Sequence, residues 1–430
     1  MRIDELIVYK NFGNDSLLED MAYLMDNYKD GKEDRDYLRS LAFDCIHRLL
    51  EMGGNHGFTG NLWHCYLTNL LVNNENTYSR STEIRGQILG TVNEAVLHDI
   101  VIFKELYDYD FSDMIDDLSL DAMRLVFDYK ASTEESKVYN DRIRKRICDL
   151  AETFHNDNTP DGMKDSLTQF YKEYGVGRFG LHKAFRVSHG IDDEVSIVPI
   201  LNIAHVKLED LVGYDIAKQK LIENTEAFVS GRRANNCLLF GDAGTGKSSS
   251  IKAIANRYYE SGLRIIEIYK HQFKDLNDVI AQIKNRNYKF IIYMDDLSFE
   301  EFEVEYKYLK AVIEGGLEKK PKNVLIYATS NRRHLVNERF SDRDDALHKG
   351  DTMQEKLSLV SRFGCTIYFG LPEKKEYQEI VLELARREGI DMDKDELLLE
   401  ANKWEVAHGG RSGRCARQFI DYLLGKEQTT

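Results

Sequence analysis

Hydrophobic positions follow two different spacings in the two parts of this chain. In residues 38–50 apolar side chains recur every three or four positions, the spacing of one buried helix face, and Gly53 with Gly54 is expected to end that helix. Similar stripes run through residues 62–71, 84–106, 120–129 and 143–154. Because this part has one proline, Pro160, and few alternating strand patterns, the spacing predicts an all-helical N-terminal domain over residues 1–190.

Short, continuous apolar runs follow the glycine-rich stretch 175–190, which is the predicted linker. They alternate with helical segments and occupy residues 237–240, 264–268, 289–294, 323–328 and 366–369. Continuous apolar strands separated by helices are typical of a parallel sheet that is covered on both faces. The pattern predicts an α/β core over residues 191–372 and, from residue 373 to 430, a small lid of three helices.

The sequence GDAGTGKS, Gly241 to Ser248, follows the first of these strands and precedes a helical segment. It fits the G-x-x-x-x-G-K-[ST] phosphate loop, in which backbone N–H groups surround the phosphates of a nucleoside triphosphate. Lys247 would reach the β and γ oxygens, and the Ser248 hydroxyl would coordinate Mg²⁺. The alternative is a glycine-rich turn that matches by chance. The predicted nucleotide contacts here are Gly241, Asp242, Ala243, Gly244, Thr245, Gly246, Lys247, Ser248 and Ser249.

Two later strands also end in polar residues. The run Phe290 to Met294 leads into Asp295 and Asp296, a Walker B pattern that brings two carboxylates to the carboxyl edge of the sheet. Asp295 would hold Mg²⁺ through water, and Asp296 would orient the attacking water. A helix-capping aspartate is the alternative. Asn331 follows the next strand and could hold that water or sense the γ-phosphate, although a turn-forming asparagine is equally compatible.

Two arginines complete the candidate chemistry. Arg362 precedes the last predicted strand, and Arg414 lies at the start of the last lid helix. A guanidinium group suits both positions, because its fixed fork of donors can neutralise charge on a transferring phosphoryl group.

The amino-acid composition limits the kinds of partner that we expect this chain to bind. The 430 residues carry a net charge of −15, and the first 190 contain 22 basic and 33 acidic residues. This balance argues against a broad, sequence-independent grip on nucleic acid. No run of 18 apolar residues and no signal-peptide pattern is found, so we expect a cytoplasmic protein without membrane contact. The six cysteines have no zinc or disulfide spacing.

One acidic loop looks like a calcium site and is interpreted otherwise. Asp108, Asp110, Asp113, Asp116 and Asp117 are closely spaced, but the loop lacks the glycine and the glutamate that an EF-hand needs. We interpret it as a solvated acidic loop.

The chain resembles the AAA+ ATPase superfamily in the order of its motifs. These are the phosphate loop, the paired acids, the T-S-N segment, the arginine before the fifth strand and the arginine in the lid. A narrower resemblance is to a bacterial AAA+ family, the domain of unknown function 815 family. It is carried by the phrases NNCLLFGDAGTGKSS, FIIYMDDLSFE, EYKYLKAVIEGGLE, NVLIYATSNRRHL, EKLSLVSRFG and GRSGRCARQF. The resemblance covers about residues 206–424; the helical N-terminal part matches less distinctly.

The resemblance implies a five-stranded parallel sheet, ATP and Mg²⁺ as ligands, and a homo-oligomer, commonly a hexameric ring. It makes Asn331 sensor 1, Arg362 the arginine finger donated to a neighbouring subunit, and Arg414 sensor 2, with Val212 and Gly213 in the adenine pocket. The sequence departs from the pattern twice. Asp296 replaces the usual glutamate, so hydrolysis could be slow or use Glu300, and Arg332 with Arg333 offers a competing finger.

The sequence therefore predicts an ATP-binding and ATP-hydrolysing AAA+ protein that remodels or switches a macromolecular partner. Its acidic N-terminal domain is expected to recognise a protein. Two alternatives stay open: a scaffold gated by nucleotide with negligible turnover, and a DNA-handling loader, which the acidic balance disfavours. The charged segment 337–351 is interpreted as an exposed loop.

Overall fold

The computed structural model describes residues 1–10, 12, 16–29, 33–131, 136–190, 192–299, 305–314, 321–331 and 360–427. The chain divides into two compact units, Met1–His182 and Lys183–Thr430. This division places the segment 184–189, which the sequence assigns to a linker, in the second unit.

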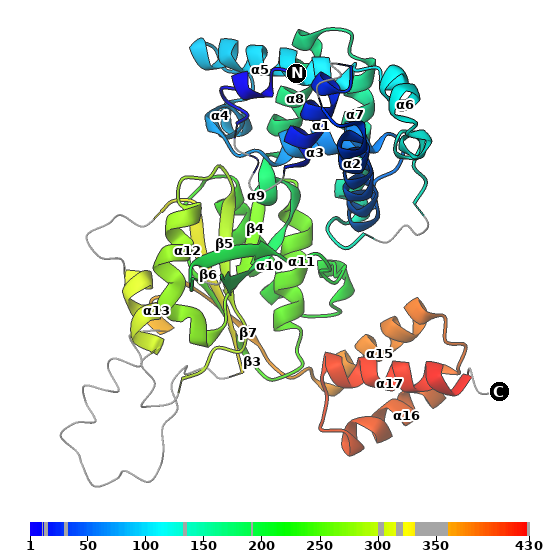
Figure 1. The fold of residues 1–430 in the computed structure, drawn as a ribbon. Coiled ribbons are helices and arrows are strands. Elements are labelled where there is room, and N and C mark those ends of the chain that lie inside the picture. The colour runs from blue at the N-terminus through cyan, green and yellow to red at the C-terminus, as the bar shows by residue number, and fades with distance from the viewer. Residues whose placement is uncertain are drawn as a thin grey trace. The chain divides into compact units, whose positions relative to one another are not determined.

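The first unit is built from helices around one hydrophobic core. Its described part also contains one isolated bridge between Gly60 and Tyr129, but no strand. Trp63 is fully buried in the core, and its indole Nε1 donates to the Leu106 carbonyl at 2.9 Å. The elements, coloured from blue to green in Figure 1, are η1 (Ile3–Glu5), α1 (Leu17–Asn27), α2 (Arg35–His56), α3 (Leu62–Asn73), α4 (Thr77–Arg85), α5 (Thr91–Tyr107), α6 (Ser112–Leu118), η2 (Asp121–Val126), α7 (Asp141–Asn156), α8 (Pro160–Tyr174) and α9 (Gly177–Leu181).

Two helix boundaries differ from the sequence expectation. Helix α2 continues past Gly53 and Gly54 and ends at Gly57, which adopts φ of 70°. Gly53 is instead a packing residue, because a Cβ atom there would lie 2.9 Å from Leu62 Cδ2. The stripe expected over residues 84–106 is split, since Gly86 and Gly90 have positive φ and separate α4 from α5.

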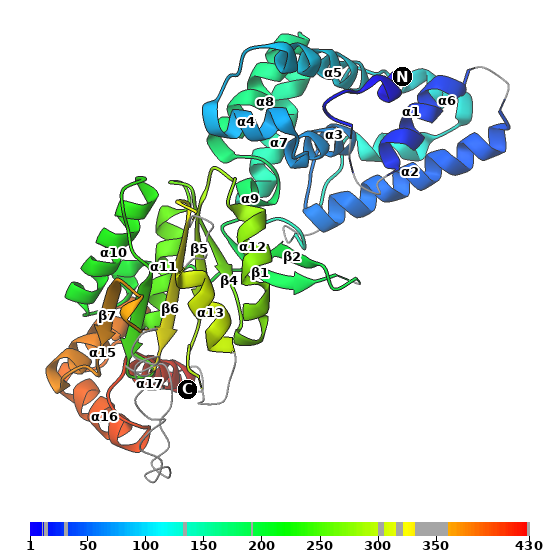
Figure 2. The ribbon, with the colours of Figure 1, turned by 90° about the vertical axis from the view of Figure 1, so that its left-hand side faces the viewer.

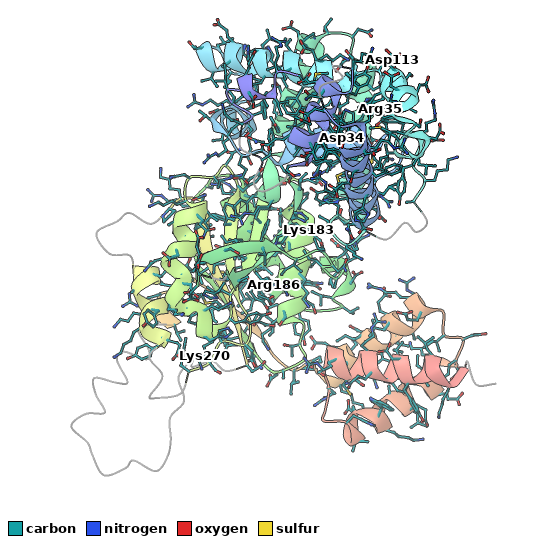
Figure 3. All side chains as sticks on the ribbon, in the orientation of Figure 1. Asp34, Arg35, Asp113, Lys183, Arg186 and Lys270 are labelled. Carbon is teal, nitrogen blue, oxygen red and sulfur yellow. The ribbon has the colours of Figure 1, made fainter. Side chains whose placement is uncertain are left out.

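Negative charges in the acidic loop of the first unit are paired with nearby lysine and arginine side chains. Asp108 pairs with Lys104 at 2.7 Å and Asp113 with Lys29 at 2.6 Å, while Asp116 lies 3.4 Å from Arg124. Figure 3 labels Asp113 among these side chains. In the described part of the chain no group of three or more His, Cys, Asp or Glu side chains is arranged to hold a metal ion.

The second unit contains a seven-stranded sheet in the order β2-β1-β4-β5-β6-β3-β7. All neighbouring strands are parallel except β1 and β2, which are antiparallel. The strands are β1 (Ala184–His189), β2 (Val195–Pro199), β3 (Cys237–Gly241), β4 (Leu263–Glu267), β5 (Lys289–Met294), β6 (Val324–Ser330) and β7 (Cys365–Phe369).

The α/β fold with a mainly parallel sheet is confirmed, but the expected count of five strands is wrong. The five predicted strands form the β4-β5-β6-β3-β7 part, and β1 extends it by pairing with β4. Strand β1 was not recognised because Arg186 interrupts its apolar run; this exposed side chain is labelled in Figure 3.

Helices cover both faces of the sheet, as Figure 2 shows, with α10 and α11 on one side and α12 and α13 on the other. Alternate strand residues such as Leu239 and Ile291 form a core with α10 and α11. The remaining elements are η3 (Leu208–Asp210), α10 (Asp215–Val229), α11 (Lys247–Tyr258), η4 (Lys270–Asp275), α12 (Leu276–Ile283) and α13 (Glu305–Glu314). This packing fixes the carboxyl ends of β3, β5 and β6 side by side.

After β7 the chain forms three helices with a small core of their own, drawn in orange and red in Figure 1. They are α15 (Lys374–Glu388), α16 (Lys394–Ala407) and α17 (Gly413–Glu427). No described helix combines the length and the apolar character that crossing a membrane would require.

Candidate functional site

A cavity of about 900 Å³ lies at the carboxyl edge of the sheet, between the core and the lid. It is lined by the loop before α11, by the residues that follow β5 and β6, and by the first turn of α17. The sequence-predicted residues on its wall are Val212, Ala243, Gly244, Thr245, Gly246, Lys247, Ser248, Ser249, Asp295, Asp296, Asn331 and Arg414. Segments far apart in sequence thus meet at one cavity.

The loop Gly241–Gly246 has the backbone that a phosphate cradle needs. Gly241, Gly244 and Gly246 all have positive φ, a region that residues with a side chain rarely adopt. A Cβ atom at Gly241 would lie 2.0 Å from the Phe369 carbonyl oxygen, so β7 leaves no room for a side chain. Helix α11 begins at Lys247, and its N-terminal N–H groups can therefore receive an anion.

Lys247 is 6% exposed, and its ammonium group is held by three oxygens. It donates to the carbonyls of Gly241 at 3.0 Å and Asp242 at 2.6 Å, and to Asn331 Oδ1 at 3.0 Å. Burial lowers the pKa of Lys247, although nearby carboxylates oppose the shift. An anion entering the cavity would restore favourable surroundings for this charge.

Asp295 accepts several hydrogen bonds on one oxygen. Ser248 Oγ donates at 2.8 Å, Tyr293 OH at 2.7 Å and Thr329 Oγ1 at 2.5 Å, all to Asp295 Oδ1. Desolvation raises the pKa of Asp295, but hydrogen bonds from Thr329, Tyr293 and Ser248 outweigh it and leave the pKa below the ordinary aspartate value. Asp295 is therefore kept as a carboxylate beside the Ser248 hydroxyl.

Asp296 is one of four non-glycine residues in the described chain with positive φ, at 49°. Its backbone N–H donates to Thr329 Oγ1 at 3.0 Å, and its Oδ1 accepts from Asn331 Nδ2 at 2.7 Å. Asn331 therefore connects Lys247 to Asp296, with one donated and one accepted hydrogen bond. Aspartate tolerates this backbone region better than most residues, which fits its presence here.

The remaining predicted residues lie around the cavity or away from it. Gly213, Gly241 and Asp242 do not line the cavity. Arg362 is half-buried in the turn before β7 and does not line the cavity, so one chain does not bring it to the other site residues. Glu300, Arg332, Arg333 and the segment 337–351 lie outside the described residues.

The lid contributes positively charged residues to the wall of the cavity. The Arg414 backbone N–H donates to the Gly244 carbonyl at 3.2 Å, and its side chain lines the cavity. Its positive charge is near enough to lower the pKa of Lys247. Arg417, which also lines the cavity, is instead paired with Glu388 at 2.5 Å.

Sequence reasoning missed most of the apolar wall. Leu211 and Tyr214 follow η3, whereas Ile380, Leu384 and Arg387 come from α15. The α15 residues repeat at four- and three-residue spacing and share one helix face, which a sequence cannot distinguish from packing within the lid.

The donor set of the cavity fits Mg²⁺. The Ser248 hydroxyl and the Asp295 carboxylate are adjacent hard oxygen donors, and Mg²⁺ commonly takes one or two such protein groups together with phosphate oxygens and water. These two residues would hold the ion, whose charge would neutralise the phosphates.

Comparison with curated proteins finds local similarity. The chain is 36% identical over 74 residues to the replication factor C large subunit of Staphylothermus marinus, 17% of each chain. It is 25% identical over 182 residues to the chromosomal replication initiator protein DnaA of Borrelia garinii subsp. bavariensis, which is 40% of this chain and 34% of that protein. The chain thus spans about a third or less of these relatives' length.

Among solved structures, a mutant of Thermotoga maritima RuvB matches with 17% identity and a TM-score of 0.36, covering 50% of this chain and 64% of the other. The model of one family, described as "Protein of unknown function (DUF815)", matches residues 181–427, which is more than half of the chain. The chain therefore belongs to the DUF815 family, within the AAA+ ATPase superfamily.

Proposed function

We propose that this protein binds Mg²⁺-ATP in the cavity between core and lid and hydrolyses it. The observation that carries the proposal is the convergence of the phosphate loop, Asp295, Asp296, Asn331 and Arg414 on one cavity of about 900 Å³. That volume suits a nucleoside triphosphate, since ligand sites commonly measure about 300–1,000 Å³. The apolar wall that contains Val212 would receive the base.

Each polar group then has one task. Lys247 and the N–H groups of the loop bind the β- and γ-phosphates, and Arg414 adds a positive charge from the lid. Asp296 is the carboxylate placed to orient water for attack on the γ-phosphorus, and Asn331 fixes the direction of that carboxylate through the 2.7 Å hydrogen bond. Asp242 joins the loop to the start of the lid, because its carboxylate accepts from Leu371 N at 3.0 Å.

The proposal extends to assembly and partner. Arg362 does not line the cavity of its own chain, which suits an arginine finger donated to the ATP of a neighbouring copy. The site would then be complete only in a homo-oligomer. The acidic helical unit is the candidate for binding a protein partner whose state changes with the nucleotide.

Isothermal titration with Mg²⁺-ATP tests the binding site. Lys247→Ala should weaken ATP binding by more than about tenfold, because it removes the one cation that the loop itself encloses. Arg362→Ala is the matched control, since it should leave ATP binding by a single chain unchanged. Equal affinity of wild type and Lys247→Ala for ATP would show that the cavity is not the nucleotide site.

Hydrolysis is separated from a nucleotide-gated scaffold by steady-state phosphate release. Asp296→Asn keeps the size and backbone tolerance of the residue but removes its basic oxygen. We expect it to bind ATP normally and to release phosphate at least about a hundredfold more slowly than wild type. Turnover that is negligible in wild type and unchanged in Asp296→Asn would favour the scaffold.

A further inference from the structure

One arginine of the lid bridges helix α15 to the segment before α10. Arg387 Nη2 donates to the Glu209 carbonyl at 2.9 Å, and its Nη1 donates to Asp210 Oδ1 at 3.3 Å. Its Nε donates to Glu383 Oε1 at 2.7 Å, on its own helix. The guanidinium group thus uses three nitrogens for three acceptors, two of them in the core and one in the lid.

The acceptors of this Arg387 bridge are themselves positioned. Asp210 Oδ2 accepts from the Lys207 backbone N–H at 2.7 Å, which fixes the carboxylate at the end of η3. Glu383 also receives two hydrogen bonds from Arg386, at 2.8 and 2.9 Å. Arg387 therefore connects two preformed anchor points.

The bridge lies beside the apolar part of the cavity. On α15, Ile380 and Leu384 line the cavity on the same helix face as Arg387. Opposite them, Leu211 and Val212 follow Asp210 directly in the chain and also line the cavity. Val212 also packs against the lid core, and Arg387, by tying Asp210 to α15, helps to hold Leu211 and Val212 next to this helix.

We propose that Arg387 is a positioning residue that holds the base-binding walls together and so supplies affinity for the nucleoside part of the ligand. This inference rests on the proposed nucleotide site. The polyphosphate part is bound by the loop 243–248, to which Arg387 makes no hydrogen bond within the described chain. Loss of the bridge should therefore weaken ATP binding but not binding of a bare polyphosphate.

The neighbouring Arg386 provides a matched control. It bonds to the same Glu383 from the same helix, its side chain is 71% exposed, and its hydrogen bonds in the described part of the chain end there. Replacing either arginine removes one positive charge from α15. Only replacement of Arg387 removes the connection to Glu209 and Asp210.

The experiment is isothermal titration of the full chain with Mg²⁺-ATP and with Mg²⁺-tripolyphosphate. For Arg387→Ala we expect a dissociation constant for ATP about tenfold higher than that of wild type, and one for tripolyphosphate within about twofold. Arg386→Ala should match wild type with both ligands. Thermal unfolding of each variant checks the fold, which loss of a partly exposed ion pair should barely change.

Two results overturn the inference while leaving the nucleotide site intact: ATP binding by Arg387→Ala equal to wild type, or equal weakening for ATP and tripolyphosphate. Failure of wild type to bind ATP would instead refute the proposed function. If Arg387→Ala does not fold, Asp210→Asn tests the same bridge from the core side, with the same selective loss for ATP. When both variants fold, the double variant should lose no more affinity for ATP than the weaker-binding single variant does. Independent losses of affinity that add up in the double variant would contradict the bridge.

Discussion

At the scale of single residues, the site is organised by oxygens that accept more than one hydrogen bond. Asp295 Oδ1 receives donors from α11, β5 and β6, so one carboxylate joins three elements. Tyr293 is 5% exposed, and burial followed by the charge of Asp295 raises the pKa of its hydroxyl. The tyrosine is therefore a neutral donor at pH 7.

The lowered pKa of Asp295 makes its contribution to stability depend on pH. A carboxyl group whose pKa is lower in the folded than in the unfolded protein stabilises the fold above its unfolded value, about 3.9, and loses this effect as the pH falls through the folded value. Tyr293→Phe removes one donor, so it should lower the free energy of unfolding at pH 7 by about 1 kcal/mol or less, with solvent screening included.

Urea unfolding at pH 7 and at pH 3 measures this difference. We expect the difference between the variant and wild type to be smaller at the lower pH, because the contribution of the Asp295 carboxylate is lost as the pH falls through its folded pKa. Tyr308→Phe, on an exposed side chain of α13, is the control and should change neither value. A loss of equal size at both pH values would mean that the Tyr293 hydroxyl stabilises the fold independently of the Asp295 charge.

At the scale of elements, strand β7 and the phosphate loop are built as one unit. The Asp242 backbone N–H donates to the Phe369 carbonyl at 3.0 Å, directly beside the close approach at Gly241. Strand β3 pairs with β7 in register from Cys237 with Cys365 to Gly241 with Phe369. The conformation of the loop is thus set by the strand next to it.

Gly241→Ala should therefore be far more damaging than an ordinary glycine replacement. The added Cβ would meet backbone at 2.0 Å, so we expect a loss of about 3 kcal/mol or more in stability and no measurable ATP binding. Gly262→Ala is the matched control, because Gly262 also has positive φ, 88°, but open space around it. Gly262→Ala should lower the free energy of unfolding by about 1–2 kcal/mol and leave ATP binding intact.

Chemical denaturation and titration with Mg²⁺-ATP compare the two alanine variants. Similar losses would show that the strain at Gly241 comes from φ alone and that β7 can move away.

How much of the fold and of the site can be predicted from the sequence depends on whether the residues that form a feature lie close together in the sequence. The phosphate loop is recognisable because its residues are consecutive, and Asp295 and Asn331 are recognisable because each follows an apolar strand. Strand β1 was missed because Arg186 interrupts its apolar run and because its place in the sheet depends on a partner far away in sequence, Phe185 lying opposite Ile266. The wall formed by Ile380 and Leu384 was missed because an apolar helix face looks the same whether it meets a ligand or a core.

At the scale of the whole molecule, the position of Arg362 outside the cavity of its own chain raises the question of a site shared between copies. If the finger acts between subunits, a mixture of Lys247→Ala and Arg362→Ala should hydrolyse ATP although neither variant does so alone. In randomly mixed rings about a quarter of the interfaces combine an intact cavity with an intact finger, so turnover should approach that fraction of wild type.

Steady-state phosphate release of the two variants, separately and mixed in equal amounts, makes the measurement. A mixture that stays inactive, from variants shown to co-assemble, would place the finger elsewhere. Arg332 and Arg333 would then be the next residues to replace.

The first unit has a core of its own, centred on residues such as Trp63 and Phe103. We therefore expect a fragment of residues 1–182 to unfold in one cooperative transition when followed by circular dichroism. A gradual, non-cooperative melt would show that this core needs the rest of the chain.

The joint between sheet and lid contains the hydrogen bonds of the phosphate loop. Asp242 binds backbone on both sides of Gly370, at Phe369 and Leu371, and Tyr214 OH donates to the Gly370 carbonyl at 3.0 Å. The phosphate loop and the residues that lead into the lid are thus bonded to one another. If the proposed nucleotide binds in the cavity, we expect a small shift of the phosphate loop to be passed through this joint to α15, α16 and α17, and to grow with distance from the joint.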